Sequence, residues 1–188
     1  MTSSDVPAEL RGAWRRRSIR VGDGDPEERY DVIWIQGSSG FVDLRLPRDA
    51  TGGLAVRIFA GTADWDGARL TWTHEIDIDP ARRAVPDVGA VELAGDVLVE
   101  RGGTGDDSYV EEYLRLTGSK DEVVVRTARL PDRALHGVWA QAGGHRLVIV
   151  DDRPLGGELV AEHAMLDDAG WRRRLAFGTL APDWQALF

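Results

Sequence analysis

The chain has 188 residues, of which 43 % are hydrophobic and 29 % are charged, and its formal net charge is −9. This composition is typical of one globular domain with a sizeable core, or of one domain with a smaller appendage. The negative charge argues against nucleic acid or an anionic membrane surface as a partner, and the absence of cysteine excludes disulfides and thiolate chemistry.

Residues 1–10 contain no apolar run that resembles a signal peptide, and no segment approaches the length of a membrane span. We therefore expect a cytoplasmic protein without a membrane span. The preference for Arg, Ala, Gly and Asp over Lys is typical of a GC-rich bacterial genome. The two arginine runs, 15–17 and 172–174, fall in predicted strands, where successive side chains point to opposite faces. They therefore form no single basic patch for nucleic acid.

The first predicted strand covers residues 10–21, and the sequence Gly-Asp-Gly-Asp-Pro at 22–26 ends it with a turn. Two further β-rich runs, 32–36 and 41–47, flank a short Gly/Ser linker, which predicts an antiparallel hairpin. Pairing Gln36 with Phe41 places Trp34 opposite Asp43 and Val32 opposite Arg45. These six side chains then share one face.

The other face of this hairpin is wholly aliphatic and carries Ile33, Ile35, Val42, Leu44 and Leu46. An aliphatic face suits a dry core, whereas the mixed aromatic and polar face suits the lining of a cavity. We therefore predict that the hairpin has water on neither side.

The clearest alternation of apolar and polar residues lies at 69–78 and predicts a half-buried strand. One face carries Leu70, Trp72, His74, Ile76 and Ile78. The other face, expected in water, carries Arg69, Thr71, Thr73, Glu75 and Asp77. His74 is thus predicted to point inward.

Further strands are predicted at 54–60, 90–93, 97–101, 108–116 and 122–130. In the segment 108–116, one face carries Tyr109, Glu111, Tyr113 and Arg115. Strands at intervals of about ten residues, with turn signals between them, indicate an all-β sandwich or barrel rather than a βαβ fold.

The C-terminal part begins at Leu135 with a Leu-x-Gly-x-Trp spacing that repeats the one at Leu10. Strands are predicted near 146–151 and 171–180. The segment 158–165 fits a strand or a short amphipathic helix, and the turn residues at 167–170 favour the strand. An apolar tail at 183–188 is expected to dock on the body of the protein.

The Gly12-x-Trp14 pair at the head of the first strand resembles a motif of the calycin superfamily, which includes the lipocalins and fatty-acid-binding proteins. The hairpin from Trp34 to Pro47 resembles functionally uncharacterised intracellular lipocalin-like proteins. The resemblance covers about residues 8–130 and implies an up-and-down antiparallel β-barrel with an internal cavity. Residues 131–188 would form a smaller β-rich section. Because the lipocalins' secretion signal and disulfides are absent, their extracellular transport role is not carried over.

The cavity face collects candidate ligand-binding residues from several strands: Trp34, Gln36, Asp43, Arg45, Trp72, His74, Tyr109, Glu111, Tyr113 and Arg115. Tyr113 and Arg115 resemble the Arg/Tyr pair with which fatty-acid-binding barrels hold a carboxylate, a role that suits the forked guanidinium. The alternative is that Arg115 pairs with Glu111 or Asp43. Asp43 and Arg45 themselves form an expected pair, either for ligand binding or to fix the hairpin.

On its face of the predicted strand His74 lies between Trp72 and Ile76, so we expect a desolvated imidazole suited to a general base or a metal ligand. The alternative is a hydrogen-bonded core histidine. The other histidines, His136, His145 and His163, lie in the C-terminal part, so we predict no metal and no cofactor. Some intracellular calycins bind haem through one histidine, and that possibility stays open.

The first functional hypothesis is an intracellular barrel that binds a small, largely apolar ligand able to carry a negative group, and it is compatible with a homodimer. The second is a cofactor-independent enzyme of isomerase, cyclase or decarboxylase type in the same cavity. There His74, Asp43 or Glu111 would act as acid or base, and a guanidinium would stabilise negative charge. The third is a barrel whose interior is filled by side chains.

Overall fold

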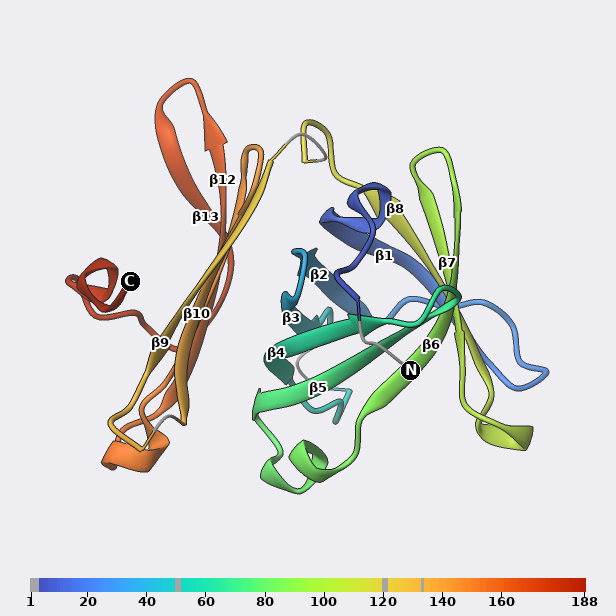
Figure 1. The fold of residues 1–188 in the computed structure, drawn as a ribbon, viewed down its shortest axis with the longest axis horizontal. Helices are drawn as coiled ribbons and strands as arrows, with labels where there is room; N and C mark the ends of the chain where they lie inside the picture. Colours follow the sequence, from blue (N-terminus) through green and yellow to red (C-terminus); the bar gives the residue numbers. More distant parts are fainter. Residues whose placement is uncertain (1–3, 50–51, 120–121, 133) are drawn as a thin grey trace.

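The computed structural model describes residues 4–49, 52–119, 122–132 and 134–188, and two antiparallel β-sheets make up most of this part of the chain (Figure 1). Eight strands close into a barrel: β1 (Gly12–Val21), β2 (Tyr30–Gln36), β3 (Gly40–Pro47), β4 (Arg57–Trp65), β5 (Arg69–Asp77), β6 (Asp87–Ala94), β7 (Val97–Gly102) and β8 (Tyr109–Arg115). Each strand pairs with the next, and β8 pairs with β1. The all-β, up-and-down barrel expected from the sequence is therefore confirmed.

Five more strands form a second sheet in the order β13-β12-β11-β10-β9. They are β9 (Val123–Arg129), β10 (Leu135–Ala142), β11 (His145–Asp151), β12 (Leu159–Asp167) and β13 (Gly170–Phe177). The segment that fitted either a strand or a helix is thus a strand, β12. The change from barrel to second sheet falls between β8 and β9, so β9 belongs to the second sheet although it lies before residue 131.

Short 3-10 helices connect or follow the strands: η1 (Ala8–Leu10), η2 (Pro80–Ala84), η3 (Gly105–Asp107), η4 (Arg153–Leu155) and η5 (Trp184–Leu187). In the part of the chain that the structure describes, no helix is long and apolar enough to cross a membrane. The tail expected to dock does so, since Trp184 and Phe188 pack against valines of β11 and β12.

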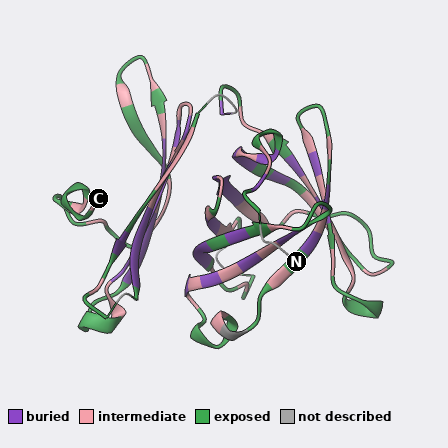
Figure 2. Ribbon diagram, in the orientation of Figure 1, coloured by how far each residue is buried: buried purple, intermediate pink, exposed green. Residues whose placement is uncertain are grey.

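The predicted hairpin register is confirmed, with Gln36 opposite Phe41, Trp34 opposite Asp43 and Val32 opposite Arg45. Its aliphatic face lies in a core between the barrel wall and the second sheet, where β10 packs across the outside of β1–β5. Its mixed face lines the barrel interior. Figure 2 shows the buried residues gathered along the strands of both sheets. Both faces of the hairpin are thus covered, one by the second sheet and the other by the rest of the barrel.

Strand β5 departs from the predicted alternation at Glu75. Its register with β4 passes from His74 opposite Gly61 to Ile76 opposite Ala60, so Glu75 is one extra residue, a β-bulge. Beyond it the faces exchange. Leu70, Trp72 and His74 face the barrel interior as predicted. Ile76 and Ile78, however, face the core between the sheets.

Asp77 was predicted to lie in water, and it is instead 1 % exposed, because the bulge turns it inward. Gly61 permits this local geometry. A Cβ at Gly61 would collide with the carbonyl oxygen of Thr73, so only glycine allows the two strands to approach so closely at the bulge.

Candidate functional site

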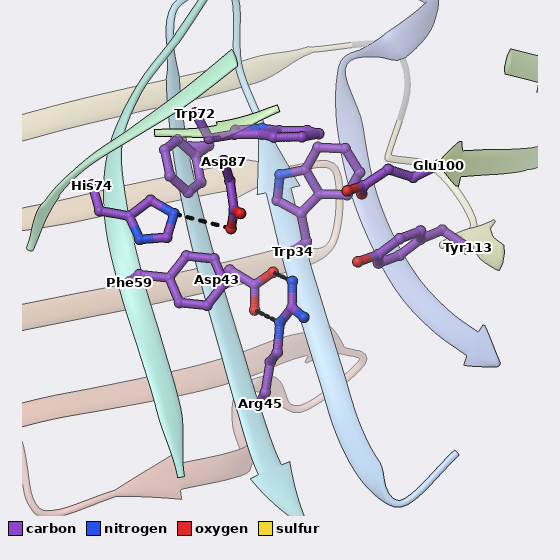
Figure 3. A pocket seen from close by; sticks show the side chains of 10 residues that line it. Trp34, Asp43, Arg45, Phe59, Trp72, His74, Asp87, Glu100 and Tyr113 are labelled. Atoms are coloured by element: carbon purple, nitrogen blue, oxygen red, sulfur yellow. Dashed lines mark hydrogen bonds and ion pairs between the residues drawn. The ribbon is translucent and has the colours of Figure 1, made fainter. Parts of the chain in front are cut away.

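A small pocket enters the barrel interior, and Figure 3 shows the side chains around it. It is lined by Trp34, Phe41, Asp43, Arg45, Phe59, Trp72, His74, Asp87, Glu100 and Tyr113. The cavity volume is about 20 Å³, which is room for about one water molecule or a compact group of a ligand. Aromatic side chains thus fill most of the interior, and polar groups gather around the space that remains.

The bulge brings His74 and Asp77 together. Nδ1 of His74 lies 2.8 Å from Oδ2 of Asp77, and both side chains are buried. This hydrogen bond favours the imidazole tautomer with its proton on Nδ1, which leaves a lone pair on Nε2. The ring stacks on Phe59, with centroids 4.5 Å apart. His74 is therefore held in one orientation, as a proton-transferring imidazole requires.

Nε2 of His74 has no hydrogen-bond partner among the described residues. Oδ2 of Asp87 is the nearby carboxylate oxygen, 3.7 Å away, and the Asp87 side chain is 44 % exposed (Figure 3). Nε1 of Trp34 is a second buried nitrogen in this pocket without a described partner. Buried polar atoms rarely stay unpaired, so both nitrogens indicate a position where a bound molecule or water completes the hydrogen bonds.

Arg45 and Asp43 form the predicted pair. The guanidinium of Arg45 donates from Nε and Nη2 to the two carboxylate oxygens of Asp43, at 3.0 Å each (Figure 3). Arg45 also approaches Glu111 at 3.4 Å. Burial raises the pKa of Asp43, while Arg45 acts to lower it. Because Arg45 is engaged by two carboxylates, it is not a free cation.

Arg16 continues this network away from the pocket. It is 3 % exposed, donates to Glu111 at 2.5 Å and to Glu28 at 2.7 Å, and so shares Glu111 with Arg45. Burial alone would raise the pKa of Glu111, but Arg45 and Arg16 together hold it below its ordinary value. The sequence contained a signal for Arg16, because alternation from the inward Trp14 also places Arg16 inward.

Glu100 of β7 is a lining residue that the sequence reasoning did not select. Burial, and then the charge of Glu111, raises its pKa to about 8, and the Tyr109 hydroxyl donates to it at 2.8 Å. A protonated carboxyl at neutral pH is a potential proton donor. The sequence indicated its position, because Glu100 lies two residues after Leu98 in a short strand and so points to the same inward face. Phe59 and Asp87 also line the pocket and were not selected.

The remaining predicted residues lie around or away from the pocket. Gln36 is buried behind it and accepts a hydrogen bond from Nε1 of Trp72 at 3.1 Å. Tyr113 lines the pocket, and its hydroxyl donates to Glu111, which lies behind. Tyr109 reaches the site through its hydrogen bond to Glu100.

Arg115 does not line the pocket. Its guanidinium lies 4.1 Å from the centroid of the Trp14 ring, donates to the carbonyl oxygens of Arg11 and Glu9, and pairs with Asp96 at 3.3 Å. It pairs with neither Glu111 nor Asp43, the alternative considered from the sequence. Arg115 therefore ties the residues before β1 to the barrel, and the carboxylate-holding Arg/Tyr pair is not assembled.

Among the described residues, no group of three or more His, Asp or Glu side chains is arranged to hold a metal ion. His136, His145 and His163 all belong to the second sheet. His136 contacts Asp152 at 2.5 Å, and His145 contacts His163 at 3.3 Å. None of the three lines the barrel pocket.

Fold and pocket together define a closed eight-stranded antiparallel β-barrel that carries a second, five-stranded sheet. No protein-family model matches the sequence, and no curated protein matches it. The structure is similar to the crystal structure of an uncharacterised protein of Saccharomyces cerevisiae, YLR301w, with a TM-score of 0.69. The match covers 90 % of this chain and 86 % of the yeast chain at 14 % identity, so it concerns the fold alone.

Proposed function

We propose that the barrel binds a compact small molecule at the pocket beside Trp34 and His74. The observation that carries this proposal is the pair of buried nitrogens, Nε1 of Trp34 and Nε2 of His74, which have no hydrogen-bond partner among the described residues and belong to side chains that line one cavity. Small-molecule sites combine apolar and aromatic walls with a few placed polar groups. Two unpaired nitrogens inside an aromatic wall meet that description.

The ligand inferred from these side chains is largely apolar and carries a small polar group. Only its polar group enters the cavity of about 20 Å³, where it accepts from the Trp34 N–H and bonds to Nε2 of His74, while its apolar part lies toward the opening, where Asp87 is exposed. Arg45, the guanidinium in the pocket lining, is already engaged by Asp43 and Glu111. A neutral polar group therefore fits this pocket better than the negative group considered from the sequence.

The wider setting belongs to the same proposal. We infer a calycin-like binding protein of the cytoplasm, based on the Gly12-x-Trp14 motif and the up-and-down order of the barrel strands. The chain would be organised as this barrel followed by a β-rich section, with β9 to β13 packed on its wall.

Native mass spectrometry of the protein purified from cell extract tests the binding proposal, followed by ligand-observed NMR with phenol, indole and benzamide. The Trp34→Phe variant keeps a ring but loses the N–H donor, so retention of the bound molecule should fall at least about tenfold. Trp139→Phe is the matched control, because Trp139 lies outside the pocket. Equal retention by both variants, or no bound molecule in any sample, would contradict the proposal.

The His74–Asp77 pair favours a second candidate, a cofactor-independent enzyme that transfers protons in the same pocket. A carboxylate that orients an imidazole, with no hydrogen bond to the other ring nitrogen among the described residues, is a general-base arrangement. Glu100, protonated at neutral pH, would be the partner acid. Reactions of isomerase, cyclase or decarboxylase type use such a pair.

This candidate is tested by incubating the bound molecule with the protein in deuterium oxide and following exchange of its C–H protons by NMR. Exchange should require His74, so His74→Gln should abolish it while the variant remains folded by circular dichroism. Asp77→Asn should slow it, because the imidazole loses its orienting carboxylate. Unchanged exchange in His74→Gln would remove His74 from the reaction.

A further inference from the structure

A larger cavity lies outside the barrel, between its wall and the second sheet. Its volume is about 280 Å³, close to the lower end of the roughly 300–1,000 Å³ typical of small-molecule sites. The lining residues that carry the argument are Arg15, Ile33, His145, His163, Met165 and Arg174. We call this cavity the intersheet cleft. It is far roomier than the barrel pocket, and a short hydrocarbon chain fits its size.

One part of the intersheet cleft is apolar. Ile33 of β2, Leu116 just after β8, and Met165 and Leu175 of the second sheet line it. Ile33, Leu116 and Leu175 belong to the core between the two sheets, so this wall continues that core. An apolar chain bound there would move from water to an apolar wall that is continuous with the protein core, and this transfer is favourable.

The cationic part of the cleft has more positive than negative charge. Two carboxylates are each shared by two guanidiniums. Asp31 accepts from Arg15 at 3.4 Å and from Arg48 at 3.2 Å.

Asp167 is the other shared carboxylate, 2.8 Å from Arg172 and 4.0 Å from Arg174. The Arg174–Asp167 contact is thus the weaker of the two. Of these charged groups, Arg15, Arg174 and the carboxylate of Asp31 line the cleft, so its lining carries two guanidiniums and one carboxylate.

A stacked histidine pair completes this side of the cleft. Nδ1 of His145 lies 3.3 Å from Nε2 of His163, and the rings are within 5° of parallel. His163 is 4 % exposed, and its Nδ1 has no partner among the described residues. When Nε2 of His163 accepts from His145, Nδ1 of His163 carries a proton and becomes a free donor.

The pKa of His163 also reflects the excess of positive charge around the cleft. Burial first, and then the neighbouring His145, Arg174 and Arg15, together lower its pKa to about 4. Neighbouring carboxylates therefore do not cancel the positive charge around His163. A neutral imidazole that donates one hydrogen bond, beside two guanidiniums, matches an anionic headgroup.

We propose that the intersheet cleft binds an anionic amphiphile, a medium-chain aliphatic carboxylate, through Arg15, Arg174 and His163. The carboxylate accepts from the two guanidiniums and from Nδ1 of His163, and the aliphatic chain lies along Ile33, Met165 and Leu175. The side chains of Arg15 and Arg174 are 52 % and 46 % exposed, so the headgroup end is open to water. This site is separate from the barrel pocket and does not depend on the function proposed there.

Isothermal titration calorimetry with octanoate tests this proposal, with octanol and inorganic phosphate as separate arms. Octanol has the chain without the charge, and phosphate has a charge without the chain. Octanoate should bind at least about tenfold more tightly than either. Equal binding of octanol would show that the cationic side contributes nothing. Equal binding of phosphate would show a simple anion site, and either result would overturn the proposal.

Variants locate the binding. Arg174→Gln should weaken octanoate binding at least about tenfold, and so should His163→Phe. Arg173→Gln is the matched control. Arg173 is opposite Ala164 rather than His163 and so points to the other face of β13, and its replacement should change nothing. If His163→Phe fails to fold, the exposed Arg174 still decides the outcome. Equal effects of Arg173→Gln and Arg174→Gln, or no octanoate binding to the unmodified protein, would refute the site.

A last control separates the two cavities. Trp34→Phe alters the barrel pocket and should leave octanoate binding within about twofold, because Trp34 does not line the intersheet cleft. Loss of octanoate binding in Trp34→Phe would place octanoate inside the barrel and overturn the proposal.

Discussion

Nδ1 of His74 lies 2.8 Å from Oδ2 of Asp77 because one extra residue in β5, Glu75, turns Asp77 to the inward face that His74 already occupies. In a regular strand, residues three apart point to opposite faces and cannot meet. The bulge therefore creates the pair, and the pair is what orients the imidazole at the pocket. Bulges are frequent beside functional sites for this reason.

Replacement of Gly61 tests the dependence of this pair on the bulge. Gly61→Ala should lower the free energy of unfolding by about 2–3 kcal/mol, because the new Cβ collides with the backbone of Thr73. Urea denaturation measures the change. Gly144→Ala is the control, since a Cβ there meets Leu166 at an ordinary 3.8 Å. Equal losses in the two variants would mean that close approach at Gly61 does not matter.

Removal of the charge on Asp77 tests the hydrogen bond itself. Asp77→Asn should destabilise the protein by about 1.5–3 kcal/mol in urea denaturation, because a buried imidazole loses its charged partner. Asp87→Asn is the comparison, since Asp87 faces the same imidazole at 3.7 Å but is 44 % exposed. Its loss should cost less than about 1 kcal/mol. A larger effect at Asp87 would reverse the assignment of the orienting carboxylate.

The sequence predicts the hairpin of β2 and β3 correctly because its alternation is unbroken from Val32 to Leu46, so parity alone assigns both faces. The same reasoning wrongly places Asp77 in water. The residue pattern of β5 contains no sign of the bulge at Glu75, which only the pairing of β5 with β4 reveals. Arg115 shows a second limit. The alternation of a strand gives the face on which a side chain lies but not its position along the barrel axis. Arg115 is opposite Trp14, at a level beyond the pocket, and therefore does not line it.

The intersheet cleft was outside the reach of sequence reasoning for a related reason. Its residues come from the barrel and from the second sheet, and nothing local relates Arg15 to His163 or Arg174. Their proximity depends on how one sheet packs on the other. Glu100 differs from these residues because the sequence does indicate its position. It lies two residues after Leu98 in a short strand and therefore shares the inward face of Leu98.

The buried pair of Arg45 and Asp43 should be costly to break on one side. Arg45→Met should destabilise the protein by about 3–5 kcal/mol, because the carboxylates of Asp43 and Glu111 lose their shared cation. The double variant Asp43→Asn/Arg45→Met should recover part of this loss in urea denaturation. Arg29→Met, which breaks an exposed pair with Glu27, should cost less than about 1 kcal/mol. No recovery in the double variant would show that Arg45 acts through packing.

The position of Arg115 predicts a structural role. Arg115→Met should lower the free energy of unfolding by about 2–4 kcal/mol, because it loses the contact with Trp14 and the bonds to two carbonyl oxygens. Binding at the barrel pocket, followed by NMR, should stay unchanged, because Arg115 does not line it. Loss of ligand with unchanged stability would restore the carboxylate-holding role considered from the sequence.

Glu100 gives the protein a stability that depends on pH. Burial, and then the charge of Glu111, raises the pKa of Glu100 from 4.5 to about 8 on folding, so between these values the folded state holds a proton that the unfolded state has lost. The contribution of Glu100 to the free energy of unfolding is therefore complete below pH 4.5 and is lost as the pH rises toward 8. Its slope is at most about 1.4 kcal/mol per pH unit.

Urea denaturation between pH 6.5 and 8 should therefore show a decline in stability that Glu100→Gln removes, whereas below pH 6.5 the lowered pKa of His163 gives a slope of the opposite sign. The amide is neutral at every pH and still accepts from the Tyr109 hydroxyl, so the variant retains that hydrogen bond. Glu92→Gln is the matched control, because Glu92 is an exposed glutamate on the neighbouring strand and should leave the slope as it is. If the decline persists in Glu100→Gln, Glu100 is ionised at neutral pH and the pocket lacks its proton donor.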